Sequence, residues 1–421
     1  MIYKKKEIGS YNLHMIKTDK FKTINIEVIF RNKVKKEEIT ITNFLSSILT
    51  YTTKKYPTKN SFSKRLEDLY AAKLFPTCYR IGNFYNVDFN IQILDEKYSE
   101  FGMLDETIDT IKEVIFNPNI CDNMFDINSF NVIKNIEIAQ IKRFKEDSRK
   151  YSIIKMLQLL DENEVFSYNG YGYMEDLEKI TPSSLYEFYN KFINESLIDV
   201  FIVGNIDFAK TEKIIKDKLK FRIYKKNKIN PILKARNPRK KIKTIFEPDN
   251  TNQAKLSIGC TIDEMTKYER EYVFNIYNII LGATADSKFF KNIREKYSMC
   301  YYISSIGNKL DNLLIITSAI TKENFEKMMI LVKKELKEME QGNFTEDDIE
   351  NAKKYYKNIL NESYDKPSQI ISSYYAMEIL DIDSIEKRKK EIMNVTKKDI
   401  MELSKKVHID TIFLLGGDKN W

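Results

Sequence analysis

Residues 180–204 read ITPSSLYEFYNKFINESLIDVFIVG, and residues 395–416 read VTKKDIMELSKKVHIDTIFLLG. In each segment a helical stretch is followed by an Ile-Asp pair and an apolar strand that ends in Gly. The two Ile-Asp pairs, at 198–199 and 409–410, lie 211 residues apart in a chain of 421 residues. A unit repeated at half the chain length predicts two domains of about equal size, each closing with the same helix and strand.

The start of each repeat carries a helix-capping signal. Thr181 followed by Pro182 suits the N-cap and the first position of a helix. Thr396 with Asp399 three residues later resembles a capping box, with Asp in place of the usual Glu or Gln. Both repeats should therefore begin with a well-defined helix.

A basic segment separates the two halves. Residues 225–243, KKNKINPILKARNPRKKIK, hold two prolines and nine basic residues without a strong period. We predict an N-terminal domain at 1–224, this segment as a linker, and a C-terminal domain at 244–421. A solvated linker is favoured over the alternative, a patch that binds an anionic ligand.

Each half mixes strands with long helices. Apolar and polar residues alternate in the strand-like segments 22–31 and 86–94, and the second half adds strand-like segments at 254–262, 299–307 and 312–320. Helical patterns include 37–52, 60–72, 98–117, 126–163, 266–281, 286–296, 322–341, 345–363 and 395–406. No βαβ alternation with a Gly-rich phosphate loop occurs. The pattern predicts an α+β fold in which a sheet packs against helices in each domain.

The composition argues against a disordered, nucleic-acid-binding, disulfide-rich or membrane-spanning protein. Hydrophobic residues make up 43% and charged residues 31%, a globular balance. The net charge of +8 fits a solvated surface better than a nucleic-acid groove. Four scattered cysteines without a CxxC pair are typical of reduced thiols. With no signal-peptide core and no apolar run of about 18 residues, we expect a cytoplasmic protein without membrane or nucleic-acid partners.

Two further segments bear on chemistry. Residues 282–305 read GATADSKFFKNIREKYSMCYYISS, and residues 43–55 read NFLSSILTYTTKK. The chain has only two histidines, His14 and His408, which are 394 residues apart. Each is therefore expected to be structural or exposed rather than catalytic.

The chain resembles the M16 metallopeptidases, which include mitochondrial processing peptidase and insulin-degrading enzyme, and is most similar to a non-catalytic bacterial subgroup. The segments that carry the resemblance run along nearly the whole chain: FKTINIEVIFR, TKKYPT, EDLYAAKL, EDLEKITPSSLYEFY, NTNQAKLSIG and IREKYSMCYY. The resemblance implies two tandem homologous M16-type (LuxS/MPP-like) domains.

Active M16 peptidases carry His-x-x-Glu-His on a helix, in which the histidines bind zinc and the Glu is the general base. The matching positions here are Asn43, Ser46 and Ser47. The third ligand, a downstream Glu, falls on Gln140 in the preferred register or on Glu137 in a shifted one. Asn and Ser are weak neutral ligands, and Ser cannot replace a carboxylate base. We therefore expect no zinc and no catalytic residue in this chain.

The second segment keeps features of the family's substrate-binding half. The resemblance assigns substrate binding to Arg294 and Tyr301, seven residues apart, and to Gly282 and Ser287 of the preceding loop, although Ala283 replaces a second Gly. An Arg and a Tyr hydroxyl can both donate to a peptide carbonyl or a developing oxyanion. From residue type alone, a surface Arg and a core Tyr remain the simpler interpretations.

Together these features predict the zinc-less subunit of a heterodimeric M16-type peptidase. A partner with an intact His-x-x-Glu-His would hold the zinc, and this chain would supply Arg294, Tyr301 and part of the chamber wall to bind peptide substrate. The resemblance further implies a link to aminopentanol modification of elongation factor P. The alternatives are a subunit that processes the leader of a ribosomal peptide product, or a purely structural scaffold.

Overall fold

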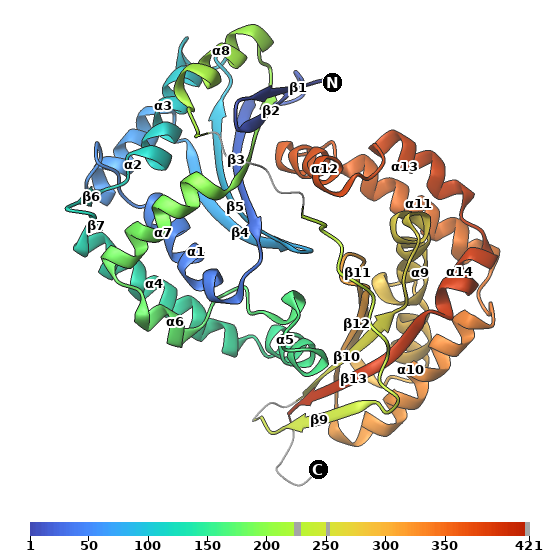
Figure 1. Ribbon diagram of the computed structural model, residues 1–421. Coiled ribbons are helices and arrows are strands. Elements are labelled where there is room, and N and C mark those ends of the chain that lie inside the picture. The colour runs from blue at the N-terminus through green and yellow to red at the C-terminus, as the bar shows by residue number, and fades with distance from the viewer. Residues whose placement is uncertain (223–228, 250–252, 417–421) are drawn as a thin grey trace. The chain divides into compact units, whose positions relative to one another are not determined.

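The structure is a computed structural model that describes residues 1–222, 229–249 and 253–416. The chain forms two compact units. Unit 1 comprises Met1–Arg143, Asn169–Ile229 and Asp365–Tyr375, and unit 2 comprises Phe144–Tyr168, Asn230–Tyr364 and Ala376–Trp421. Each unit has one large sheet with packed helices, so the predicted α+β class is confirmed (Figure 1).

The sheet of unit 1 has six strands in the order β1-β2-β8-β3-β5-β4. Only β2 and β8 pair in parallel, and the other neighbours are antiparallel. The strands are β1 (Ile2–Ile8), β2 (Tyr11–Lys17), β3 (Thr23–Lys33), β4 (Lys73–Ile81), β5 (Phe84–Leu94) and β8 (Leu197–Gly204). This order leaves β4 as an edge strand.

Helices of unit 1 gather on one face of this sheet, where apolar side chains form the core (Figure 1). They are α1 (Lys36–Leu49), α2 (Lys59–Asp68), α3 (Met103–Phe116), α4 (Ile127–Glu146), α6 (Met174–Lys179), α7 (Pro182–Glu195) and α8 (Phe208–Lys218), with a short ribbon of β6 (Ile120–Cys121) and β7 (Met124–Phe125). The last three residues of α4, from Phe144, belong to unit 2.

The sheet of unit 2 has five strands in the order β11-β12-β10-β13-β9. They are β9 (Lys243–Glu247), β10 (Ala254–Ile262), β11 (Cys300–Asn308), β12 (Leu313–Ile320) and β13 (Val407–Leu415). Only β13 and β9 pair in parallel. Here β11 is the edge strand that corresponds to β4.

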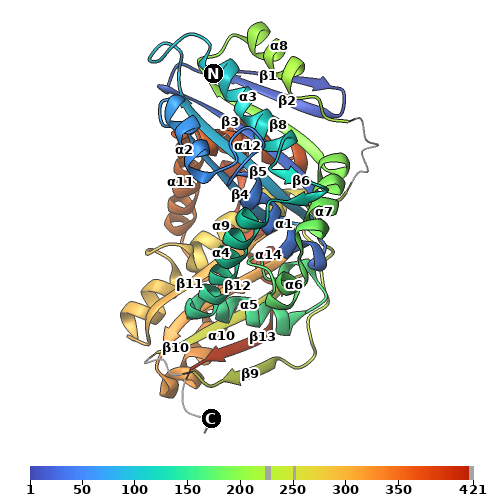
Figure 2. The same ribbon diagram turned by 90° about the vertical axis from the view of Figure 1, so that its left-hand side faces the viewer.

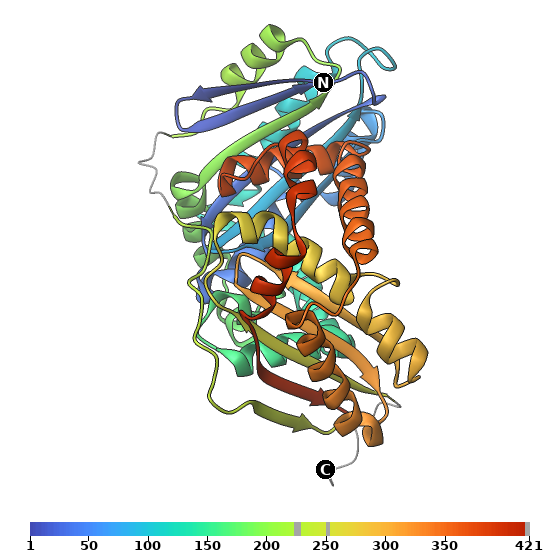
Figure 3. The same ribbon diagram turned by 90° about the vertical axis from the view of Figure 1, so that its right-hand side faces the viewer.

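Helices cover both faces of the sheet of unit 2. On one face lie α9 (Phe274–Asn278), α10 (Phe325–Glu340), α11 (Glu346–Glu362), α13 (Ile385–Glu391) and α14 (Lys397–Ser404), seen in front of the strands in Figure 3. Three π-helical segments, Glu269–Val273, Ile279–Ala283 and Phe289–Lys296, accompany them. On the other face α5 (Ser148–Leu160) packs on β10 and β13 (Figure 2). The helix α12 (Pro367–Leu380) is shared, since its residues up to Tyr375 belong to unit 1.

The repeated segments occupy equivalent places in the two sheets. Thr181 is the predicted N-cap of α7 and forms a capping box there, and Thr396 forms the predicted capping box of α14. The strands that follow, β8 and β13, each pair antiparallel with one neighbour (β3 or β10) and parallel with another (β2 or β9). The two domains therefore share one topology.

The predicted helix at 126–163 is wrong as a single element. It breaks between α4 and α5 at Asp147, whose side chain accepts a hydrogen bond from the backbone N–H of Lys150 and caps α5. The break transfers α5 to unit 2. There α5 lies so close to β10 that a Cβ at Gly259 would stand 2.4 Å from the sulfur of Met156.

The described part of the predicted linker is anchored to unit 2. Arg239 donates to the carboxylate of Asp410 at 2.5 Å, and Arg236 forms an ion pair with Asp161. Residues 225–228 of the predicted linker lie outside the described residues. Among the helices that the structure describes, none combines the length and the apolar character needed to cross a membrane.

Two carboxyl groups meet on the sheet of unit 1, on the face opposite α1. Glu27 of β3 and Asp88 of β5 are both buried and lie within hydrogen-bond reach of each other. Burial raises the pKa of both side chains, and the charge of Asp88 raises the pKa of Glu27 further. Two adjacent buried carboxylates repel each other, so the folded protein keeps a proton here that the unfolded chain releases.

We expect the free energy of unfolding to fall as the pH rises from about 4, the ordinary carboxyl range, through neutrality. Each proton held only by the folded state contributes a slope of about 1.4 kcal/mol per pH unit. Glu27→Gln should flatten this slope, whereas Glu37→Gln, on the exposed face of α1, should not. Urea titrations at pH 5 to 8 measure the slopes, and an unchanged slope in Glu27→Gln would contradict the assignment.

Candidate functional site

The positions that match the zinc motif lie on α1 and face a cavity of unit 1. Asn43 and Ser47 are one helical turn apart and share a face of the helix, with Ser46 beside them. The cavity has a volume of about 560 Å³. Its lining also includes both candidate third-ligand positions and comprises Asn43, Ser46, Ser47, Thr50, Pro76, Cys78, Ile133, Ile136, Glu137, Gln140, Gly170 and Tyr171.

The polar groups on α1 are engaged with protein atoms. The side-chain amide of Asn43 donates to the carbonyl of Gly170 at 2.8 Å and accepts from the Tyr85 hydroxyl at 2.7 Å. The Ser46 hydroxyl donates to the carbonyl of Asn43 at 2.8 Å. The same hydroxyl accepts from the Cys78 thiol at 3.2 Å. These bonds tie α1 to β4, β5 and the loop before α6.

Glu137 is the acidic side chain of this cavity. The Ser47 hydroxyl donates to its carboxylate at 2.8 Å, and the residue is only 3% exposed. Burial raises the pKa of Glu137, and the hydrogen bond from Ser47 opposes that shift. Of the two registers considered, the one with Glu137 brings the third-ligand position into contact with the second histidine position. Gln140 lies one turn further along α4 and lines the same cavity.

This donor set does not fit a catalytic zinc ion. Zinc sites of this type use two imidazoles and a carboxylate, whereas this cavity offers amides, hydroxyls and one carboxylate. Burial raises the pKa of the Cys78 thiol to about 12, so the thiol stays protonated at neutral pH and is a poor ligand. Within 1–222, 229–249 and 253–416, no cluster of three or more His, Cys, Asp or Glu could hold a metal ion.

The cavity also borders the edge strand of its sheet. Pro76 and Cys78 of β4 line it, and the neighbouring Phe75 is 48% exposed. An edge strand presents backbone N–H and C=O groups that an extended peptide can pair with. Pro76 lacks an N–H, which is tolerated at an edge. The surroundings of α1 thus combine a polar cavity with a strand that a peptide can extend.

In unit 2, Tyr301 stands at a β-bulge near the start of edge strand β11. Cys300 pairs with Ile320 and Tyr302 with Ala319, so Tyr301 is the extra residue between them. A bulge of this kind redirects the side chain that it carries. The side chain of Tyr301 is 72% exposed, and its hydroxyl has no hydrogen-bond partner in the described part of the chain. The core interpretation of Tyr301 is therefore wrong.

Arg294 lies seven residues earlier, near the end of the π-helical segment Phe289–Lys296. Its guanidinium carbon is 4.5 Å from the centre of the Phe290 ring, a cation–π contact that fixes the side chain without neutralising it. The described residues provide no carboxylate partner for Arg294. π-Helical turns are rare and frequently occur at functional sites.

Gly282 and Ser287 have roles inside their own loop. A Cβ at Gly282 would stand 2.6 Å from both the Phe289 ring and the Ser305 hydroxyl, so only glycine allows this close packing. Ser287 is 1% exposed, and its hydroxyl donates to the carbonyl of Thr284 at 2.6 Å. Both residues hold the loop that precedes Arg294, and direct contact of either with substrate stays a prediction.

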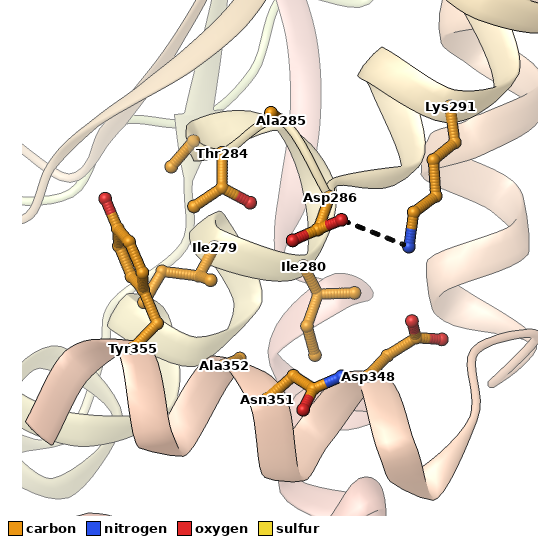
Figure 4. Close-up of a pocket in the computed structure, with 11 residues that line it drawn as sticks. Ile279, Ile280, Thr284, Ala285, Asp286, Lys291, Asp348, Asn351, Ala352 and Tyr355 are labelled. Carbon is orange, nitrogen blue, oxygen red and sulfur yellow. Dashed lines mark ion pairs between the residues drawn. The ribbon is translucent and has the colours of Figure 1, made fainter.

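A second cavity, of about 420 Å³, opens beside this loop (Figure 4). Figure 4 shows Asp286 and Lys291 facing each other, 4.0 Å apart, across the cavity from Tyr355 of α11. Arg294 and Tyr301 are not among its lining residues. The sequence reasoning missed the α11 wall (Asp348, Asn351, Ala352 and Tyr355), for which exposed polar residues on an amphipathic helix were the only signal.

The remaining candidates are structural. His14 is fully buried in β2, where its ring nitrogens lie 3.2 Å from the carboxylate of Asp199 and 2.8 Å from the Tyr3 hydroxyl. His408 in β13 contacts the carboxylate of Asp263 at 3.1 Å. Each histidine therefore pairs with a carboxylate of its own unit, which agrees with the structural role expected from the sequence.

Comparisons with known proteins agree with this geometry. A family model described as "Peptidase M16 inactive domain" matches residues 179–356. The chain is 25% identical over 419 residues to the "Probable inactive metalloprotease YmfF" of Bacillus subtilis (strain 168), covering 98% of this chain and 97% of that protein. The structure is similar to that of a conserved protein from Enterococcus faecalis V583, with a TM-score of 0.92, 26% identity and coverage of 100% and 99%.

One larger structure shares the fold. The periplasmic protease PqqL of Escherichia coli matches with a TM-score of 0.73 and 13% identity, over 99% of this chain but 48% of that one. At this identity the likeness concerns the fold alone. The two units described above thus correspond to half of that protease.

We expect that three substitutions, Asn43→His, Ser46→Glu and Ser47→His, create a zinc site, because Glu137 already contacts position 47. The purified triple variant should retain about one zinc ion per chain after desalting, measured by plasma mass spectrometry.

Adding Glu137→Gln to the triple variant should remove that zinc, whereas adding Gln140→Ala should not. A folded triple variant without zinc, or zinc that survives Glu137→Gln, would show that Glu137 is not in the ligand position.

Proposed function

We propose that this chain is the zinc-less subunit of a heterodimeric M16-type peptidase. The premise is that the chain belongs to the M16 peptidase family as a homologue of a probable inactive metalloprotease. The partner would carry an intact His-x-x-Glu-His and supply zinc and the general base. This chain would supply Arg294, Tyr301 and part of the chamber wall to a peptide substrate. The observation that carries the proposal is that unit 2 holds an exposed Tyr301 and an Arg294 without a carboxylate partner, while the described residues contain no cluster that could hold a metal ion.

The α1 cavity supports a non-catalytic role for unit 1. Metal-assisted hydrolysis needs a cation that lowers the pKa of bound water to about 7 and a base to accept its proton. The Ser46 hydroxyl can neither bind such a cation well nor act as the base. The Asn43 side-chain amide is already hydrogen-bonded to Gly170 and Tyr85. Hydrolysis would therefore depend on groups supplied by another polypeptide.

Arg294 and Tyr301 in unit 2 support a role in transition-state stabilisation. Hydrogen bonds to a developing oxyanion contribute about 10²–10³-fold in rate per donor when the donors are preorganised. The bulge holds Tyr301 and the Phe290 ring holds Arg294, so both donors are positioned before substrate arrives. A hydrogen-bond or ion-pair partner within the protein would have to be displaced before substrate binds. Neither side chain has such a partner among the described residues.

Peptide is the substrate class that suits these elements. The edge strands β4 and β11 offer main-chain hydrogen bonds that any extended peptide can accept, which gives affinity with little sequence selection. Gly282 and Ser287 would contribute by fixing the loop that sets the start of the Arg294 segment. The link to elongation factor P stays a prediction that the resemblance implies.

We assign this complex to the cytoplasm. The four cysteines are free thiols, as expected in a reducing compartment.

We expect this chain, co-expressed with an M16 paralogue of the same organism that has an intact zinc motif, to copurify as a heterodimer with about one zinc ion and peptidase activity. In that heterodimer, Arg294→Ala and Tyr301→Phe should each lower kcat/KM for a quenched-fluorescence peptide by about 10²-fold, without loss of zinc or assembly. The exposed neighbours Lys296 and Tyr297 provide the controls Lys296→Ala and Tyr297→Phe, which should retain activity.

Two results would refute the proposal. Full activity in both Arg294→Ala and Tyr301→Phe would leave this chain a structural scaffold. Stoichiometric zinc and peptidase activity in the chain purified alone would make it a peptidase in its own right.

A further inference from the structure

A third cavity lies in unit 2, where the turn between β11 and β12 meets the end of α12 and residues 230–232. Its volume is about 310 Å³. Most of its wall is apolar, from Pro231, Ile232, Leu310, Ile379, Leu380 and Ile382. Its charged lining residues are Lys267, Arg270, Glu271, Lys309 and Asp381. Three cations against two carboxylates leave an excess of one positive charge.

Two of the cations are already paired. The Lys267 ammonium donates to the backbone carbonyl of Asp381 at 2.6 Å and to its carboxylate at 3.2 Å. The Arg270 guanidinium donates to the carboxylate of Glu264 and to the amide oxygen of Asn312, both at 3.3 Å. Both groups are therefore already engaged by acceptors of the protein.

Lys309 carries the excess charge. Its ammonium group has no ion pair and no hydrogen bond among the described residues. The Lys309 backbone carbonyl accepts from Arg270 at 3.3 Å, which fixes the turn that presents the side chain. An unpaired ammonium in an apolar cavity loses hydration without gaining a counter-ion, and this costs free energy until an anion binds.

The titration of Lys309 agrees with this geometry. The pKa of Lys309 is lowered to about 8, chiefly by burial; the positive charges of Arg388 and Arg270 contribute to this shift, and the carboxylate of Glu271 opposes it. The lysine is still largely protonated at pH 7. An anion beside it would favour the charged form.

We propose that this cavity binds an apolar monocarboxylate, with its carboxylate on the Lys309 ammonium and its hydrocarbon part against the wall formed by Pro231, Leu310 and Ile379. The volume is at the lower end of small-molecule sites, roughly 300–1,000 Å³. This limits the ligand to an aryl or branched alkyl acid, or to the C-terminal residue of a peptide. A single lysine suits a carboxylate better than a phosphate, which usually recruits an Arg fork or a helix N-terminus.

The site is independent of the proposed peptidase function. Neither Arg294 nor Tyr301 lines this cavity, and Lys309 lies beyond the far end of β11 from Tyr301. Binding there needs no partner subunit and no zinc, so it can be measured on the single chain.

Isothermal titration calorimetry at pH 7 with 4-phenylbutanoate and its uncharged amide, 4-phenylbutanamide, tests the proposal. We expect the acid to bind at least about tenfold more tightly than the amide, because the amide cannot pair with the ammonium. Lys309→Met should weaken binding of the acid at least tenfold, and Lys309→Arg should largely retain it. Lys327→Met, an exposed lysine on α10, is the control and should bind as the unsubstituted chain does.

Peptides distinguish the two sources of carboxylate. N-acetyl-Ala-Ala-Phe with a free C-terminus should bind more tightly than 4-phenylbutanoate if the natural ligand is a chain end, and less tightly if it is a small acid. Equal binding of acid and amide, unchanged affinity in Lys309→Met with an unchanged melting temperature, or no binding of any acid at millimolar concentration would each overturn the proposal.

Discussion

The architecture depends on one strand in each sheet that pairs with its neighbours in two directions. β8 in unit 1 and β13 in unit 2 are antiparallel to one neighbour and parallel to the other. Parallel neighbours cannot be joined by a tight hairpin and need a longer connection, so the two strands of each parallel pair are distant in sequence. With the repeated strand in the interior, β4 and β11 are left as edges. The candidate peptide-binding residues lie at or beside these two edges.

The units are not two continuous halves of the chain, because each keeps a segment from the other half. Capping by Asp147 ends α4 and starts α5, and α5 then covers β10 and β13 through Met156, Leu157 and Leu160. In the other direction, residues 365–375 join unit 1, where the Tyr375 hydroxyl donates to the Asn86 amide oxygen at 2.5 Å. Each unit therefore includes a helical segment that is distant in sequence from the rest of that unit.

The two candidate sites differ in whether their polar side chains already have partners within the protein. Around α1 most of the hydrogen-bonding groups are neutral and contact one another, and burial raises the pKa of the one carboxyl group, Glu137. Around β11, Tyr301 is exposed and Arg294 is half-buried, and among the described residues neither side chain has a hydrogen-bonding or carboxylate partner. Satisfied groups stabilise a fold, whereas exposed donors without partners contribute little to it. The proposed subunit role of Arg294 and Tyr301 rests on this difference.

Much of the fold followed from local patterns. Alternation predicted β3 and β5, and strand-like segments predicted β10, β11 and β12, because these signals depend on residues close in sequence. The repeat predicted two domains, and the family resemblance predicted their M16 fold. The neutral residues at positions 43, 46 and 47 argued against a zinc site through their side-chain chemistry alone. Tertiary structure alone decided three other features: the bulge that exposes Tyr301, the contact between Ser47 and Glu137, and the transfer of α5 to unit 2. Each depends on strand register or on packing between segments far apart in the chain, which no local pattern encodes.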